Sequence, residues 1–304
     1  MNTKTKGLYL ILATGVISGF AVFFNKFAVG AFESSSVYTT MKNLIVALIL
    51  SLAILTPAVA NKLSELKKKD WLKLILIGLV GGSIPFLLFF KGLSMTTAVS
   101  AGFLHKTLFI WVTLLAIPFL KEKVSKIQLG ALLLLVFGNV FFLGGVKVFN
   151  FDAGSLLIIA SVLLWSVEYI IVKKLISHIQ PKVLAWSRMA IGSVFLMLFL
   201  VFTGQFTSLF SVSWTGFAWT MVAGVFLLGY VITWYSSMKY LPVTVVASVL
   251  VIGSPITTML NNVFVTHSFK VNQIIGGLII LASAGVILFI HFRKNNAVIE
   301  QQKI

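Results

Sequence analysis

The chain of 304 residues is 59% hydrophobic and only 10% charged, and its mean hydropathy is +1.05. Soluble domains carry about 25% charged residues, so this composition excludes a soluble globular protein. The chain has no cysteine, which excludes disulfides and thiolate metal sites. The net charge of +17 would suggest a nucleic-acid partner in a soluble protein, but here the positions of the basic residues indicate membrane topology.

Apolar segments of about 18 to 24 residues, enough to cross a bilayer, follow one another along the chain. Because a backbone in lipid must satisfy its own hydrogen bonds, each segment predicts a helix. The first follows a basic start that is typical of a signal peptide, but it is too long for one and is interpreted as a retained span. We predict an all-α polytopic membrane protein with ten spans, at 7–29, 38–58, 71–90, 96–119, 127–146, 153–174, 183–203, 216–236, 242–264 and 273–292.

The lysines and arginines between these spans are distributed unevenly. Sixteen lie on the side of the membrane that holds the N-terminal residues, and these include Lys67, Lys68 and Lys69. Three lie on the other side, namely Lys91, Lys147 and Lys270. By the positive-inside rule, this bias predicts that both termini are cytoplasmic in a cell (inner) membrane. It also explains the basic charge without nucleic acid. The run from Lys67 to Lys69 is expected to contact anionic lipid.

The two halves of the chain resemble each other at an offset of 146 residues. Lys42 matches Arg188 near the start of two spans, and Gly130 matches Gly276. Each half, 1–146 and 147–304, holds five spans, an odd number, so we predict two inverted five-helix repeats. Inverted repeats recur in transporters, with the substrate site at the midplane between them. The alternative is a duplicated scaffold with no transport role.

Three stretches carry a resemblance to a known family: Leu120-Lys-Glu122-Lys-Val-Ser before Gly130, Gly253-Ser-Pro255, and Leu164-Trp165-Ser-Val-Glu-Tyr169 leading to Lys173-Lys174. With these stretches the chain resembles the EamA-type carriers of the drug/metabolite transporter superfamily over nearly its whole length. The resemblance implies a 5+5 inverted repeat. It also implies a secondary transporter that exports amino acids or related amphipathic metabolites by alternating access.

The chain departs from this family at two positions. Phe109 stands where the family usually has proline, and Ser268 stands where the second repeat would match Glu122. We interpret the family glutamate as a loop and helix-cap feature, so its loss at Ser268 need not affect transport.

Ionisable side chains inside a bilayer are costly and usually functional. Lys106, with His105 beside it, is predicted near the midplane of the fourth span, and Glu168 lies nearer the cytoplasm in the sixth. We predict an ion pair between Lys106 and Glu168, as a permanent structural bridge or as a switch that substrate or a proton opens; the alternative is that the two side chains never meet. Lys42 and Arg188 are interpreted mainly as residues that extend to the headgroups.

Aromatic residues near these charges suit amphipathic substrates or cations, although those of the eighth span could instead form an interfacial belt. Proline and glycine inside the third and ninth spans favour kinks and free carbonyls at the expected site depth, with tight packing as the alternative. The predicted substrate-binding residues are His105, Lys106, Trp165, Glu168, Tyr169, Tyr230, Trp234 and Ser254, and the predicted hinge residues are Gly81, Gly82, Pro85, Gly253 and Pro255.

No catalytic motif of the hydrolase, metalloprotease or nucleotide-binding kind is present, so we expect no enzyme, no metal and no cofactor. The expected partners are a small-molecule substrate, membrane lipids and a candidate coupling proton, with no nucleic acid; the protein would be a monomer or a homodimer. Two other functions stay open. A lipid-linked sugar flippase would need a lateral opening and a larger polar cavity, and a non-transporting receptor or membrane enzyme would be filled at the midplane.

Overall fold

The structure is a computed structural model that describes residues 3–56, 59, 63–96, 98–144 and 151–301. The regular secondary structure of these residues is helical. Three short segments are η2 (Phe206–Leu209), η3 (Leu250–Ile252) and the π-helical η4 (Asn262–Thr266). The α-helices are α1 (Thr3–Gly30), α2 (Ser35–Ile54), α4 (Lys68–Val80), α5 (Ile84–Leu93), α6 (Ala98–Lys106), α7 (Leu108–Leu120), α8 (Lys126–Phe142), α9 (Ala153–Leu175), α10 (Pro181–Phe202), α11 (Trp214–Met238), α12 (Val243–Val249), α13 (Gly253–Asn261) and α14 (Val271–Gln301).

The predicted all-α membrane class is confirmed. Within the described residues, nine helical segments are long and apolar enough to cross a membrane. The remaining predicted span, 127–146, corresponds to α8, a shorter apolar helix of 17 residues. Three of the spans are interrupted: α4 with α5, α6 with α7, and α12 with η3 and α13.

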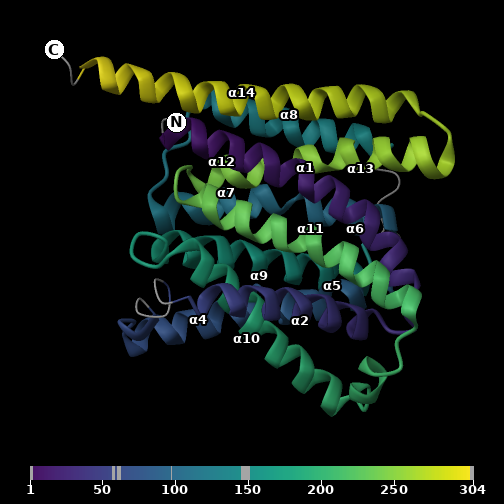
Figure 1. The fold of residues 1–304 in the computed structure, drawn as a ribbon. Helices are drawn as coiled ribbons and strands as arrows, with labels where there is room; N and C mark the ends of the chain where they lie inside the picture. The colour runs from purple at the N-terminus through teal and green to yellow at the C-terminus, as the bar shows by residue number, and fades with distance from the viewer. Residues whose placement is uncertain (1–2, 57–58, 60–62, 97, 145–150, 302–304) are drawn as a thin grey trace.

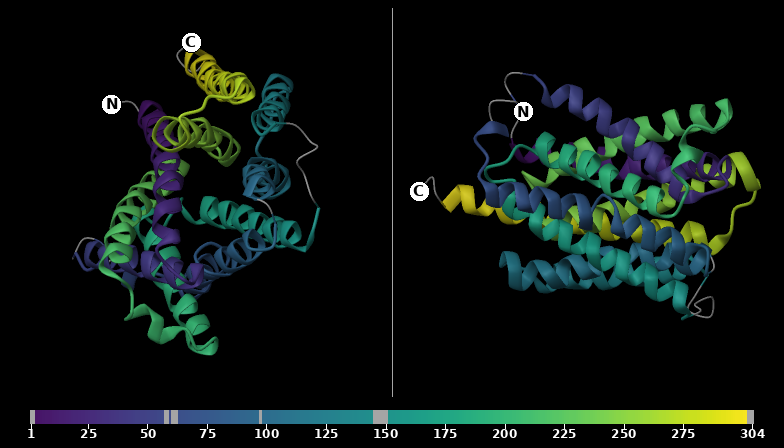
Figure 2. Two further views of the ribbon diagram at one scale, coloured as in Figure 1. Left: turned by 90° about the vertical axis from the view of Figure 1, so that its right-hand side faces the viewer. Right: turned by 90° about the horizontal axis from the view of Figure 1, so that it is seen from below.

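The helices run side by side, and their connections lie at two ends of the bundle (Figure 1; Figure 2, left, looks along them). We call the end with connections 121–125, 176–180 and 239–242 the basic end, on the left of Figure 1. The far end has connections 31–34, 203–213 and 267–270. Helix α1 packs against α11 and α13, α10 against α2 and α4, and α14 against α8. The two halves of the sequence therefore interleave in space.

Two of the helix interruptions are related by the repeat. The break between α6 and α7 falls at Thr107, and the offset of 146 residues leads to Gly253, where α13 begins. The break between α4 and α5 spans 81–83, but the matched residues 227–229 lie inside the continuous α11. The repeats thus share one broken helix and differ in the other.

The outer surface is apolar, unlike that of a soluble protein, although the interior also holds an apolar core. Leu52 is 72% exposed and Phe202 is 85% exposed, whereas Glu168 is fully buried and Arg188 is only 6% exposed. Apolar side chains facing outward suit a lipid surround, and charges facing inward avoid it. The buried charges therefore mark the place to look for a site.

Candidate substrate site

The centre of the candidate site is a buried ion pair between α9 and α10. Arg188 Nη1 donates to Glu168 Oε2 at 2.5 Å, and Tyr235 Oη of α11 donates to Glu168 Oε1 at 2.6 Å. Glu168 lies seven residues before the end of α9 and Arg188 seven residues after the start of α10. Both are thus about 10 Å from the basic end. Three helices meet at one carboxylate.

Aromatic rings surround the guanidinium of Arg188. Its central carbon lies 5.3 Å from the ring centre of Trp234 and 5.8 Å from that of Phe86. Trp234 Nε1 in turn donates to Tyr169 Oη at 2.9 Å, and Trp234 also stacks on Tyr230 with ring centres 6.0 Å apart. Such cation–π neighbours stabilise a desolvated cation and present a face to which an amphipathic ligand could bind.

The break between α4 and α5 brings bare backbone against this pair. A Cβ added at Gly81 would lie 2.3 Å from the carboxyl carbon of Glu168, and one at Gly82 would lie 2.0 Å from the Arg188 carbonyl oxygen. The carbonyl of Gly81 accepts from Trp165 Nε1 at 3.1 Å, and that of Gly82 accepts from Asn43 Nδ2 at 3.3 Å. Only glycine allows this approach.

The site has unused hydrogen-bonding capacity. Arg188 Nε and Asn43 Oδ1 are buried and have no hydrogen-bond partner within the described chain. Buried polar atoms normally have partners. An arginine whose charge is balanced by one carboxylate, but whose fork is not fully used, can exchange that carboxylate for a carboxylate of a ligand.

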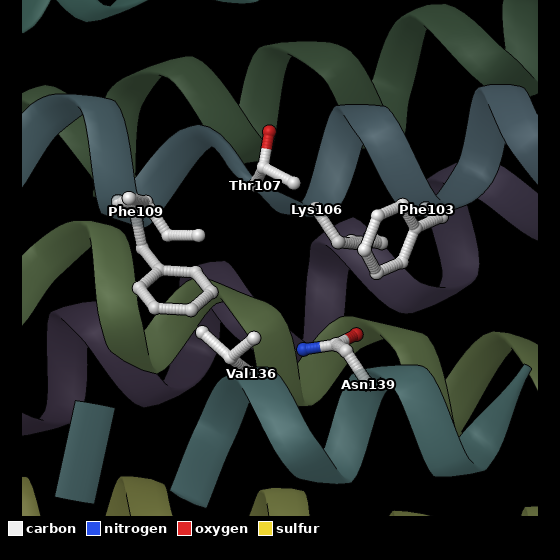
Figure 3. Close-up of a pocket in the computed structure, with 7 residues that line it drawn as sticks. Phe103, Lys106, Thr107, Phe109, Val136 and Asn139 are labelled. Carbon is white, nitrogen blue, oxygen red and sulfur yellow. The ribbon is translucent and has the colours of Figure 1, made fainter. Parts of the chain in front are cut away.

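The predicted ion pair between Lys106 and Glu168 is wrong. Glu168 pairs with Arg188, and Lys106 lines a small pocket between α6–α7 and α8 (Figure 3). The reason is the rotation of α9 about its axis, which turns Glu168 toward α10 and α11. It turns Trp165 toward His105, with ring centres 5.3 Å apart. The pocket is lined by Phe103, Lys106, Thr107, Phe109, Ile110, Val136 and Asn139.

The predicted site residues are thus only partly brought together. Trp165 of α9 is hydrogen-bonded to the break between α4 and α5. Tyr169 of α9 is hydrogen-bonded to the cluster of aromatic residues on α11. Ser254 lies on α13 instead, where its buried hydroxyl has no hydrogen-bond partner among the described residues. Neither Lys42 nor Arg188 extends along the outer surface as a headgroup-seeking cation, because both are buried.

The chain matches the model of the EamA-like transporter family twice, over residues 5–144 and 152–289. The chain belongs to the EamA-like transporter family. A search of curated proteins finds no matching relative. Among solved structures, one whose title reads only "Crystal structure of protein" matches with a TM-score of 0.76 and 17% identity, and the match covers 94% of this chain and 99% of the other. At that identity the likeness shows the fold alone.

The Glu122 position of this EamA-like transporter has the capping role that the sequence predicted. Its carboxylate accepts from Val243 N at 2.8 Å and from Thr244 N at 3.2 Å, at the start of α12, and from Thr244 Oγ1 at 2.8 Å. At the C-terminal end of α11, Lys173 Nζ from α9 donates to the carbonyls of Met238 at 2.5 Å and Leu241 at 2.7 Å. The helix dipole favours the negative charge of Glu122 at the N-terminus of α12 and the positive charge of Lys173 at the C-terminus of α11. Together they hold the 239–242 connection at the basic end.

The predicted hinge positions coincide with helix interruptions in this transporter. Gly81 and Gly82 lie in the turn between α4 and α5, and Pro85 follows in the first turn of α5. Gly253 and Pro255 open α13 directly after η3. The break at Thr107 occurs although Phe109 replaces the family proline. That these breaks move stays a prediction.

Sequence reasoning missed Arg188 and Tyr235 as partners of Glu168. One signal was available: within the described spans Glu168 is the acid most distant from a helix end, and a lone carboxylate there requires a cation, but this signal does not distinguish Arg188 from Lys106. Tyr235 is next to Trp234 in the sequence, but helical spacing alone does not decide which of two neighbours points inward.

Proposed function

We propose that this protein is a secondary transporter that exports small metabolites, such as amino acids or related amphipathic compounds, by alternating access between its two inverted repeats. The observation that carries the proposal is the buried Glu168–Arg188 pair. It lies against the interrupted α4–α5 helix, and the chain belongs to a family of transporters. A fixed scaffold would gain little from a desolvated ion pair.

The chemistry of the site supports this substrate class. The Arg188 guanidinium can accept a substrate carboxylate in place of Glu168, while Trp234 and Phe86 offer ring faces to an apolar or cationic portion. Glu168, when released from Arg188, becomes a carboxyl group that can take up a proton as access changes. The predicted orientation places the basic end, and with it this pair, toward the cytoplasm of the cell membrane.

The test is uptake of labelled amino acids into proteoliposomes, with and without a proton gradient, by the wild type and by Glu168→Gln. Gradient-driven transport that the variant loses supports a carrier in which Glu168 couples substrate to protons. Equal transport by both proteins retains the carrier and assigns Glu168 to the scaffold. His178→Gln is a matched control, since its ring is bonded to Asp70 near the basic end, away from the Glu168 contacts.

Absence of transport for every amino acid, with folding verified by thermal unfolding of the reconstituted protein, would contradict the proposed substrate class. The same liposomes then report on the flippase alternative. A fluorescent lipid-linked sugar in the outer leaflet becomes protected from quenching only if the protein moves it across.

A further inference from the structure

Lys42 is a second buried cation at the position of the first repeat that matches Arg188. It lies on α2, seven residues after Ser35, so it is about 10 Å from the far end. Its side chain is only 5% exposed. The inverted repeat therefore places one cation at the same depth from each end of the bundle.

Within the described chain, the contacts of the Lys42 amine are with neutral groups. Its Nζ donates to Asn25 Oδ1 of α1 at 2.8 Å and lies 4.7 Å from the ring centre of Tyr38. The Tyr38 hydroxyl donates to the same Asn25 oxygen. The ion pairs within the described chain join Arg188 to Glu168 and His178 to Asp70, and neither includes Lys42.

A buried ammonium without a counter-ion is unfavourable, and an amide oxygen replaces only part of its hydration. Thr39 adds a second unmet requirement. It lies one helical turn before Lys42 on the same face of α2, is 1% exposed, and its hydroxyl has no hydrogen-bond partner in the described part of the chain. Among the described residues, the buried amine of Lys42 thus has no carboxylate partner and the Thr39 hydroxyl has no hydrogen-bond partner, and an anion could use both groups.

We propose that Lys42 and Thr39 bind the carboxylate of the transported substrate when the far end of the bundle is open. This inference rests on the proposed transport function and adds to it a substrate group and a second subsite. A carboxylate carries one negative charge, which matches the single charge of Lys42, and its two oxygens can accept from Nζ and from the Thr39 hydroxyl. A doubly charged phosphate would leave one negative charge buried without a partner.

The two cation sites then have different tasks. Arg188 is already neutralised by Glu168, so a ligand must displace a carboxylate there. Lys42 has no carboxylate to displace, so a substrate anion gains the whole interaction. The inference predicts that substrates without a carboxylate bind poorly at the far end, whatever their apolar portion.

The experiment measures thermal unfolding of the purified full chain in detergent as a function of ligand concentration. The probes are L-phenylalanine and L-leucine, their carboxamides, and inorganic phosphate. The variants are Lys42→Gln, Lys42→Arg, and Lys26→Gln as the matched control. Lys26 is an exposed lysine next to Asn25, and its Nζ is 3.3 Å from Asn261 Oδ1.

The expected result is that the acids, and not the amides, raise the unfolding temperature of the wild type and of Lys26→Gln. Apparent affinity should fall by roughly tenfold or more in Lys42→Gln, because one charge-assisted hydrogen bond is lost, and Lys42→Arg should retain the preference for the acids.

Equal stabilisation of the wild type by acids and amides, an unchanged acid affinity in Lys42→Gln, or no stabilisation by any acid would each overturn the inference. Stronger stabilisation by phosphate than by the acids would overturn the carboxylate assignment. If the proteoliposomes still transport the labelled amino acids in any of these cases, the transporter proposal stands without it.

Discussion

Lys42 in the first repeat and Arg188 in the second stand at equal depths from opposite ends, yet they are stabilised in different ways. Arg188 is bound by the carboxylate of Glu168, whereas Lys42 is bound by the amide oxygen of Asn25. The helix beside Arg188 is interrupted at 81–83, while the matched region of α11 is continuous. Inverted duplication preserves the backbone plan, but the polar groups of each half have diverged. The two ends of the bundle therefore differ in the chemistry of their buried cations.

The largest expected effect on stability is at Arg188, whose charge is balanced by Glu168. Arg188→Gln leaves Glu168 buried without a cation, so we expect a loss of about 3–5 kcal/mol in the free energy of unfolding and loss of transport. The double variant with Glu168→Gln should recover part of that stability, because neither charge is then unpaired. Thermal unfolding in detergent measures both. A single variant as stable as the wild type would contradict the importance of the ion pair.

The next effect compares the interrupted helix with the continuous one. In Gly82→Ala the new methyl group would lie 2.0 Å from the Arg188 carbonyl oxygen, so the backbones must separate at a cost of about 1–3 kcal/mol or more. Gly229→Ala in α11 is the control, since its nearest neighbour would be Ile17 at 3.4 Å, an ordinary contact. If both variants unfold at the same temperature, the close approach at the break is not needed for stability.

A smaller effect is expected at the basic end. Glu122→Gln keeps one acceptor but removes the charge that caps α12, so about 1 kcal/mol of stability should be lost. The exposed Glu33 serves as the control, as Glu33→Gln should leave the denaturant midpoint of unfolding unchanged. Unfolding curves over increasing denaturant distinguish the two. A Glu122→Gln protein that matches the control would show that the cap is dispensable.

The smallest effect is expected at the cation without a carboxylate. Lys42→Gln removes a desolvation cost and one hydrogen bond of about 1 kcal/mol, and these largely cancel. We therefore expect the free energy of unfolding without ligand to change by no more than about 0.5 kcal/mol. A loss as large as that of Arg188→Gln would mean that the two repeats hold their cations equally tightly.

The sequence predicted the spans, the repeat and the location of two helix breaks. Hydropathy, segment length and the glycine–proline stretches are properties of short stretches of sequence and do not depend on how the helices pack. It also predicted a capping role for Glu122, but the helix start that Glu122 caps is that of α12, far away in the sequence, whereas the adjacent α8 is capped by Ser125. It could not predict that Glu168 pairs with Arg188 rather than Lys106. Such a choice depends on the rotation of each helix about its axis, and helices that are apolar on every face leave that rotation unspecified.

The prediction that Lys42 and Arg188 extend to the headgroups was wrong for a related reason. A basic residue two turns inside a span can reach the headgroups if it faces lipid, and it requires internal partners if it faces the bundle. Both residues face the bundle. The short distance to a span end is therefore insufficient to assign a role, and the matched spacing of the two residues was the more informative observation.

The packing of α1 also bears on how the protein is made. Thr14 Oγ1 on α1 donates to Thr233 Oγ1 at 2.9 Å, and the carbonyl of Gly19 accepts from Thr257 Oγ1 at 2.8 Å. These partners leave the ribosome more than two hundred residues after α1 has been synthesised. Helices insert into the bilayer before they associate, so Thr14 and the Gly19 carbonyl lack these partners until the second repeat has been inserted, whereas Asn25 of α1 can already pair with α2. Translation that stops between the repeats would leave a membrane intermediate open to quality control, not half of a working carrier.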